Sequence, residues 1–349
     1  MTIATDQPTT TSLCDFSLTS DQKVVREAAR DFARQEIDPL VEELDEAQQF
    51  PIELFAKAGE LGFLGVIFPE EYGGSGLGYV DYVLVITEVS KVDPSIGLSV
   101  AAHNSLCSNH IYKFGTEEQR QRWLVPLASG KKIGAWSLTE PDAGSDAAGT
   151  RTRAEKVEGG WVLNGSKTFI THGSVGDICV VMAVTDPDGP RNHNLSAFVL
   201  EKGMEGFRAG KKENKLGSRA SDTSEVVMQD CFVPDENLLG ERGDAFIQAV
   251  KILDGGRISI AALGLGTAIG AYETALAYAK ERQQFGKPIA EFQAIRFMLA
   301  DMATKIDAAE QLVYRAAWLK DQGQTVTRES AMAKLFASEI GVEVADKAL

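Results

Sequence analysis

The chain has 349 residues, of which 44% are hydrophobic and 24% charged, and its formal net charge is −15 at pH 7. This length exceeds one ordinary hydrophobic core and predicts two or three domains. So acidic a chain lacks the basic footprint that nucleic acids and anionic membrane surfaces require, which excludes both as expected partners.

The amino-terminal sequence and the cysteines indicate a cytoplasmic protein of bacterial origin. The residues MTIATDQPTTTSL resemble neither a secretory signal nor a mitochondrial presequence, and no apolar run is long enough to insert into a membrane. The cysteines are widely spaced and include no Cys-x-x-Cys pair: Cys14, Cys107, Cys179 and Cys231. This pattern favours reduced thiols over a disulfide framework or a zinc site.

Residues 1–132 show helical patterning from their first apolar stripe onward. A capping box is expected where Thr19 precedes Gln22, and a second where Thr116 precedes Gln119, because each pair has the Thr-x-x-Gln spacing. We therefore predict an N-terminal helical domain.

Residues 133–240 change to short runs of β-forming residues, separated by turn signals at 159–160, 164–165 and 186–189. Strands at this spacing, with no helices between them, predict an antiparallel β-barrel or sandwich. This region is the predicted middle domain.

Residues 241–349 return to a helical period, which is interrupted at 286–288 and near Gly323. The apolar stripe continues to Leu349 without a Gly, Asn or Pro stop signal. The sequence therefore predicts an α+β multidomain chain with helices, strands and helices in that order, whose C-terminal bundle is incomplete.

Three other motifs are rejected by their context. The segment 257–270 has the glycines of a dinucleotide-binding turn, but no second strand or acidic residue follows, so we expect these glycines to permit close helix packing. Segment 165–168 lacks the spacing of a phosphate loop. The histidines have no metal-ligand spacing, so no metal is expected: His103, His110, His172 and His193.

Two segments could carry a binding site. Segment 136–146 leaves a β run and turns at Pro141, presenting hydroxyls and backbone N–H groups that could hold an anion or the polar edge of a flavin. An ordinary strand-ending turn is the alternative. Phe169 and Thr171 end the second strand of a hairpin, where they could flank a planar ring, or else belong to a barrel face.

Taken in their order and spacing, these features resemble the acyl-CoA dehydrogenase family over essentially the whole chain. The matching blocks are PEEYGGSGLG (69–78), SLTEPDAGSDAAG (137–149), NGSKTFIT (164–171), KLGSRASDT (215–223), LDGGR (253–257) and ERQQFGKPIAEFQAIRFMLADM (281–302). One departure from the family's first signature is Ser137, where Gly, Ala or Cys is usual.

The resemblance implies an N-terminal helical domain, a middle β domain and a C-terminal four-helix bundle, assembled as a homotetramer. It also implies FAD as cofactor and the α,β-dehydrogenation of an acyl-CoA to the trans-2-enoyl-CoA, with electrons passed to an electron-transferring flavoprotein. Gly256 and the KLGSRASDT block are most similar to members that act on short straight or branched acyl chains.

The resemblance also assigns site residues. The flavin would contact Trp136, Leu138, Thr139, Gly144, Ser145, Phe169, Ile170 and Thr171. A neighbouring subunit's FAD would be reached by Arg282, Phe285 and Gln293, and the acyl-CoA by Ser145, Asp254, Gly256 and Arg257. Phe169 replaces a more common Trp, and His172 a common Asn.

The catalytic base departs from the family pattern. Most members carry a base Glu after a Gly-Gly-x-Gly-Tyr stretch, which is absent here, and others carry it just before the Arg of the LDGGR block, where this chain has Gly256. We therefore expect the base beyond Leu349. The alternatives are an acyl-CoA oxidase or nitroalkane oxidase of the same superfamily, and a non-catalytic, truncated form that binds flavin or CoA.

Overall fold

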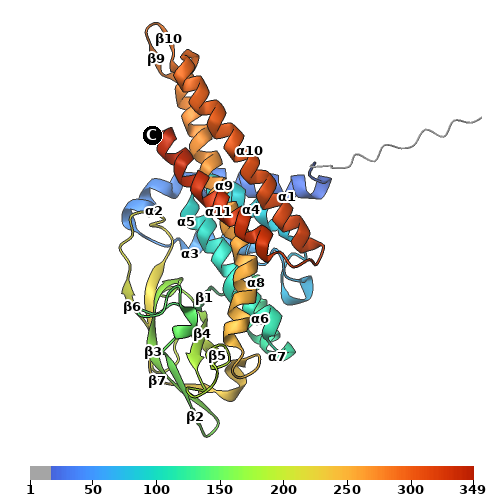
Figure 1. The fold of residues 1–349 in the computed structure, drawn as a ribbon, viewed down its shortest axis with the longest axis vertical. Helices are drawn as coiled ribbons and strands as arrows, with labels where there is room; N and C mark the ends of the chain where they lie inside the picture. The colour runs from blue at the N-terminus through green and yellow to red at the C-terminus, as the bar shows by residue number, and fades with distance from the viewer. Residues whose placement is uncertain (1–16) are drawn as a thin grey trace, which may run out of the picture.

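A computed structural model describes residues 17–349, so the predictions for Cys14 and for the amino-terminal targeting segment lie outside the described residues (Figure 1). The N-terminal region is helical, as predicted. Both capping boxes are present, since Thr19 accepts a hydrogen bond from the backbone of Gln22 while the Gln22 side chain accepts one in return, and Thr116 and Gln119 do the same. The helices are α1 (Ser20–Phe32), α2 (Val41–Ala47), α3 (Ile52–Glu60), α4 (Tyr79–Val92), α5 (Pro94–Ala102), α6 (Asn109–Phe114), α7 (Glu117–Gln119) and α8 (Val125–Ala128).

The middle region forms one twisted sheet at the lower end of the molecule (Figure 1). Its hydrogen-bonded order is β6-β7-β3-β2-β4-β5-β8, and β1 pairs with β4. The strands are β1 (Gly134–Ser137), β2 (Arg153–Val157), β3 (Gly160–Thr171), β4 (Ile178–Val184), β5 (Leu195–Glu201), β6 (Phe207–Lys212), β7 (Thr223–Pro234) and β8 (Leu238–Leu239).

The sheet corrects the prediction of an antiparallel barrel. Most pairs are antiparallel, but β4 runs parallel to β1 and to the start of β2, and the described order ends at β6 and β8 without closing. The reason is the long connection 138–152, which carries the chain back so that β1 and β2 point the same way; a short hairpin turn would have made them antiparallel.

The turn predicted at 164–165 is wrong, because these residues lie inside β3 (Gly160–Thr171). The register with β7 shifts there, and Gly165 has φ +152°, so the pair forms a β-bulge. A side-chain carbon on Gly165 would lie 2.5 Å from Oγ1 of Thr152. Asn164 exchanges hydrogen bonds of 3.1 and 2.8 Å with Asp230 of β7, which fixes the bulge.

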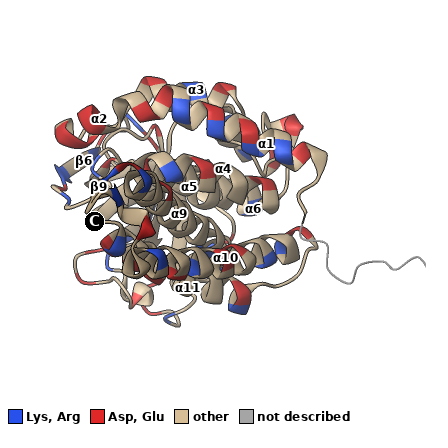
Figure 2. Ribbon diagram, turned by 90° about the horizontal axis from the view of Figure 1, so that it is seen from above, with Lys and Arg blue, Asp and Glu red and all other residues tan. Residues whose placement is uncertain are grey.

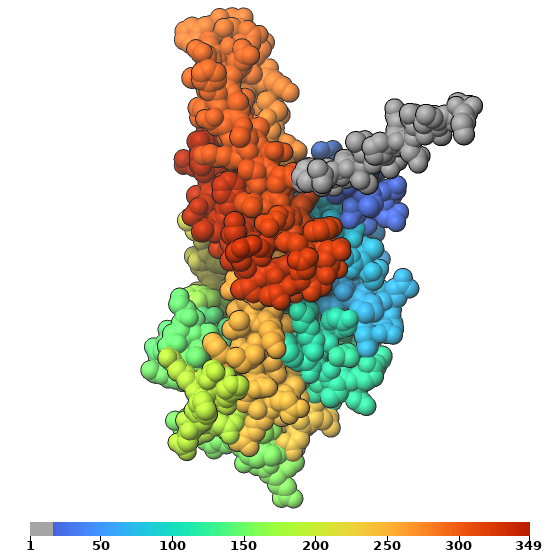
Figure 3. Space-filling model, turned by 45° about the vertical axis from the view of Figure 1, so that its right-hand side comes forward, coloured from blue at the N-terminus to red at the C-terminus, as the bar shows by residue number. Residues whose placement is uncertain are grey.

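The C-terminal region consists of three long helices, α9 (Ala245–Glu281), α10 (Gln293–Asp321) and α11 (Thr327–Ala348). A small hairpin of β9 (Gln283–Gln284) and β10 (Lys287–Pro288) joins the first two at the upper tip of the molecule (Figures 1 and 3). Helix α4 packs against α9 and α10, and α11 packs along α9, so the described four-helix arrangement takes one helix from the N-terminal region.

The glycines of α9 permit close helix packing, as predicted, and lie within one continuous helix, which excludes a dinucleotide-binding turn. A side-chain carbon on Gly266 would lie 2.5 Å from the carbonyl oxygen of Thr87 in α4, and one on Gly264 would lie 2.8 Å from that of Ala337 in α11. These distances are shorter than any real side chain tolerates, so only glycine allows the observed helix separation.

Helix α9 is also the one described helix whose length and composition would allow it to cross a membrane. Several of its buried residues, including Ile258 and Leu265, belong to the same hydrophobic cluster as α4 and α11. Figure 2 shows charged residues gathered on outer helices such as α1, α3 and α10, around a largely uncharged α9. Its apolar character thus serves the core of the helical region.

Candidate active site

A cavity of about 140 Å³ opens between the sheet and the helix that follows α5. It brings together six of the residues predicted to contact a flavin: Trp136, Leu138, Thr139, Phe169, Ile170 and Thr171. Three further residues complete its wall and were not singled out from the sequence: Ala102, Leu106 and Gly134. They are small or apolar residues of ordinary helical and strand patterns, which carry no local signal of a site.

A second cavity of about 200 Å³ lies next to the first and shares Ala102, Leu106 and Thr171 with it. Most of its surface is apolar, and it contains the predicted substrate residues Gly256 and Arg257. Its remaining lining was not predicted: Leu98, Ser105, Leu253, Ile260 and Lys334. Neither cavity is lined by an aspartate or a glutamate among residues 17–349.

Phe169 has two unusual properties at the edge of the first cavity. Its side chain is 65% exposed although it is a large hydrophobic residue, and its backbone has φ +59°. Left-handed backbone in a bulky residue is strained, and such strain concentrates at functional sites. An aromatic face held open to solvent beside a cavity is suited to stacking against a planar ligand.

The connection that follows β1 is anchored by a buried ion pair. The ammonium group of Lys167, in β3, lies 2.8 Å from Oε1 of Glu140 and donates a second bond of 3.1 Å to the carbonyl oxygen of Leu138. Glu140 also accepts bonds from the backbone N–H groups of Arg151 and Thr152. Lys167 is thus a structural residue, in keeping with the rejection of a phosphate loop.

Burial and charge act in opposite directions on this pair. Burial lowers the pKa of Lys167, while the charge of Glu140 opposes that change. Burial also opposes ionisation of Glu140, but the charge of Lys167 and the hydrogen bonds hold the pKa of Glu140 below its usual value. Together the two side chains fix the carbonyl of Leu138 at the cavity wall.

Trp136 is oriented by a buried histidine. Its indole N–H donates to Nδ1 of His110 at 2.9 Å, so the proton of the neutral imidazole is on Nε2, which donates to Gln248 at 2.9 Å. Burial lowers the pKa of His110 to about 4, which keeps the ring neutral at pH 7. The sequence had indicated only that this residue lacks metal-ligand spacing.

Arg257, one of the predicted substrate residues on α9, is held by a second carboxylate. Asp254 accepts from Nη1 of Arg257 at 2.6 Å and from the hydroxyl of Thr327, at the start of α11, at 2.8 Å. Asp254 does not itself line the second cavity. It fixes the guanidinium of Arg257, which lines that cavity, and its bond to Thr327 links α11 to the site.

The remaining predicted residues lie apart from the two cavities. Gly144 and Ser145 are exposed in the connection 138–152 and line neither cavity. Arg282, Phe285 and Gln293 lie on or beside the β9–β10 hairpin, which projects at the opposite end of the molecule from the sheet (Figures 1 and 3). All three are exposed, and Phe285 is 92% exposed.

Comparison with known proteins agrees with this architecture. Residues 19–131, 135–231 and 243–349 match the models of the N-terminal, middle and C-terminal domains of acyl-CoA dehydrogenase. The short-chain-specific acyl-CoA dehydrogenase of Clostridium acetobutylicum is 47% identical over 96% of this chain and 88% of its own length.

Two solved structures share the fold closely. Butyryl-CoA dehydrogenase from Megasphaera elsdenii has a TM-score of 0.94 and 45% identity, over 96% of this chain and 88% of its own. A chain solved in work on the electron transferring flavoprotein of Acidaminococcus fermentans has a TM-score of 0.95 and 50% identity, with the same coverage.

A helical domain, a middle sheet and a helical bundle that enclose two adjoining cavities define an oxidoreductase of the flavoprotein class. The chain belongs to the acyl-CoA dehydrogenase family, whose enzymes carry FAD.

Proposed function

We propose that the protein is an FAD-dependent enzyme that oxidises a short acyl-CoA thioester to the trans-2-enoyl-CoA. The observation that carries the proposal is the pair of adjacent cavities that share Thr171, one lined by aromatic and hydroxyl groups and the other mostly apolar. A cofactor in the first and an acyl chain in the second would meet at this shared wall.

The first cavity fits the flavin ring of FAD. Trp136 and the exposed Phe169 offer flat aromatic surfaces, and Thr139 and Thr171 offer hydroxyl groups to the polar edge of the ring. The bound flavin would supply the hydride acceptor for the β-hydrogen of the substrate. Gly144 and Ser145, in the connection after β1, are proposed to contact the remainder of FAD.

The second cavity fits a short acyl chain. Its volume is about 200 Å³, and apolar side chains such as Leu98 and Ile260 line it. Excluding water strengthens every polar interaction with the thioester. The guanidinium of Arg257 supplies positive charge at the same wall, and the carboxylate of Asp254 holds it in place. Short-chain and butyryl-CoA dehydrogenases are among the similar proteins.

Removal of the weakly acidic α-proton requires a general base, for which a desolvated carboxylate is suited. Among residues 17–349 neither cavity is lined by a carboxylate, and Gly256 occupies the position where some family members have their Glu. We therefore propose that the base is supplied from outside these cavity walls.

The assembly and its partners are part of the proposal. The exposed hairpin bearing Arg282, Phe285 and Gln293 projects away from its own cavities, which supports contact with the FAD of a neighbouring subunit in a homotetramer. We further propose a cytoplasmic protein that passes electrons to an electron-transferring flavoprotein; a similar chain solved in work on such a flavoprotein supports the electron transfer. The proposed domains are residues 1–132, 133–240 and 241–349.

To test the proposal, the purified 349-residue chain is reconstituted with FAD. Butyryl-CoA is then added stepwise under anaerobic conditions while the flavin absorbance is recorded. A protein that binds FAD and keeps its visible flavin band on adding butyryl-CoA would agree with a flavin site whose base is elsewhere. Bleaching of the band would show that this chain contains a base. Failure to bind FAD at all would overturn the assignment of the first cavity.

A further inference from the structure

Two strand ends line the first cavity as separate parts of its wall, without pairing with each other in the sheet. β1 (Gly134–Ser137) pairs with β4, whereas β3 (Gly160–Thr171) pairs with β2 and β7. Regular strand pairing therefore does not fix the distance between Gly134 on one wall and Thr171 on the other. Other contacts must do so.

Two hydrogen bonds join these walls, one near each end of the segment 134–139. At one end the backbone N–H of Thr168 donates to the carbonyl oxygen of Thr139 at 2.9 Å. At the other end Nδ1 of His172 lies 2.9 Å from the carbonyl oxygen of Gly134. Since a carbonyl oxygen only accepts, Nδ1 carries the proton and donates it. One end is thus held by backbone alone, and the other depends on a side chain.

The peptide of Gly134 is held on its other side by a second buried imidazole. The N–H of Gly134 donates to Nδ1 of His103 at 3.1 Å, so the opposite ring nitrogen of His103 donates to the carbonyl oxygen of Leu127 at 3.0 Å. Gly134 cannot become larger, because a side-chain carbon would lie 2.9 Å from Cβ of Cys107. Its peptide therefore has a fixed position, and His172 ties the end of β3 to it.

The backbone of His172 is itself held in an uncommon conformation. It has φ +62°, which asparagine, aspartate and histidine tolerate better than other side chains do. Its N–H donates to the carbonyl oxygen of Asp222 at 3.0 Å, and its ring packs edge-on against Phe50 and Phe55. The second ring nitrogen has no hydrogen-bond partner in the structure. Only the Nδ1 donor is used, and an asparagine amide could supply it.

We propose that His172 is a positioning residue that sets the spacing of the two walls of the flavin cavity through its bond to Gly134. The inference rests on the proposed function, which places the flavin between these walls. His172 touches neither cavity directly and acts through Gly134 and its neighbour Thr171, which line the first cavity.

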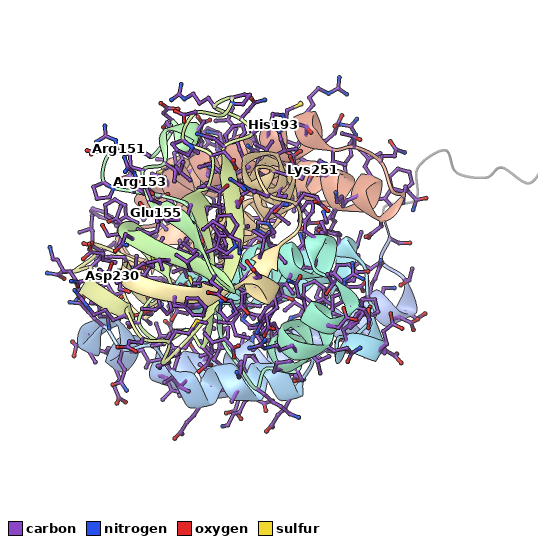
Figure 4. All side chains as sticks on the ribbon, turned by 90° about the horizontal axis from the view of Figure 1, so that it is seen from below. Arg151, Arg153, Glu155, His193, Asp230 and Lys251 are labelled. Carbon is purple, nitrogen blue, oxygen red and sulfur yellow. The ribbon has the colours of Figure 1, made fainter. Side chains whose placement is uncertain are left out.

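The experiment compares His172→Asn, which keeps both the left-handed backbone and the donor, with His172→Gly, which keeps only the backbone. His193→Asn is the control, because His193 is a half-exposed surface histidine (Figure 4). The dissociation constant of FAD and the shape of its visible spectrum are measured for each protein. We expect His172→Asn to resemble the wild type, and His172→Gly to bind FAD about tenfold more weakly with an altered spectrum.

A second measurement needs no cofactor. Amide hydrogen exchange in the apo-protein should be faster around residues 134–137 and 169–173 in His172→Gly but not in His172→Asn. Wild-type FAD affinity, spectrum and exchange in His172→Gly would overturn the inference, as would equal defects in both variants. If the wild type itself does not bind FAD, the proposed function fails, whereas the exchange result still decides whether His172 ties the two walls.

Discussion

The ammonium nitrogen of Lys167 lies 2.8 Å from a carboxylate oxygen of Glu140, where the two side chains are 0% and 5% exposed. A buried pair of this kind costs much desolvation energy, so it adds little net stability while both charges are present. Removing only one of the charges destabilises the protein, because the other charge then remains buried without its partner.

Replacing either member of this pair should destabilise the protein more than replacing both. We expect Lys167→Met and Glu140→Gln each to lower the free energy of unfolding by about 3–5 kcal/mol. The double variant should recover most of that loss, since it leaves no unpaired charge. Urea unfolding at pH 7 measures all three, and a double variant as unstable as the sum of the two single variants would contradict the expectation.

Two glycines of α9 should respond in opposite directions to the same substitution. A side-chain carbon on Gly266 would lie 2.5 Å from a backbone oxygen of α4, so Gly266→Ala should cost about 1–3 kcal/mol through overpacking. On Gly256 the nearest atom would be Cδ2 of Leu106 at 3.5 Å, an ordinary contact. Gly256→Ala should therefore stabilise the helix by about 0.5–1 kcal/mol.

Thermal unfolding of these two variants measures the contrast in stability directly, because both changes add one methyl group to the same helix. If Gly266→Ala proved as stable as Gly256→Ala, the close packing of α9 on α4 would be wrong.

The sequence predicted those features of the fold that depend on neighbouring residues. The capping boxes at Thr19 and Thr116 were correct because the whole interaction lies within four consecutive residues. The pair Asn164-Gly165 was misread as a turn, because its role as a bulge depends on Asp230 in another strand. The participation of α4 in the C-terminal bundle is likewise a long-range contact that no local pattern records.

The candidate site was predictable to a similar extent. Residues in the blocks at 137–149 and 164–171 were found through family resemblance, and the structure gathers most of them around one cavity. Ala102, Leu106 and Gly134 were missed because their role is to shape a wall, which common small or apolar residues can do. The hydrogen bonds of His103, His110 and His172 join segments too distant in sequence to be paired by inspection.

The buried histidines predict that stability falls as the pH is lowered below about 6.5. Burial, together with the nearby His172, lowers the pKa of His103 to about 3, and burial lowers that of His110 to about 4. Between these values and the unfolded pKa the unfolded chain binds more protons, so stability rises with pH. The stability that these neutral histidines contribute is complete above their unfolded pKa. It is lost as the pH falls toward their pKa values in the folded protein.

At pH 5 each of these two histidines should cost roughly 2 kcal/mol relative to pH 7. His110→Asn keeps an acceptor for Trp136 but removes the titrating ring, so its free energy of unfolding should fall less steeply over this range. Urea unfolding between pH 5 and 7 measures the slope, with His193→Asn as the control. An unchanged slope in His110→Asn would show that this ring is protonated in the folded protein.

Gly256 offers a direct test of whether a carboxylate in the second cavity can act as the base. It is buried on α9 and lines the second cavity, and a side-chain carbon there makes only ordinary contacts with Leu106 and Ser105. A glutamate at this position would place a carboxylate beside the acyl chain, and burial would raise its pKa as a general base requires. Gly256→Gln has nearly the same shape but no basic group, so it is the matched control.

We expect FAD-loaded Gly256→Glu to be reduced by butyryl-CoA under anaerobic conditions about a hundredfold faster than Gly256→Gln, the usual minimum effect of a positioned base. Stopped-flow absorbance of the flavin band measures both rates. Equal rates in the two variants would mean that a carboxylate at residue 256 does not reach the α-proton, or that another base in the chain already does so. Bleaching in the unaltered protein separates these cases, since only the second requires it.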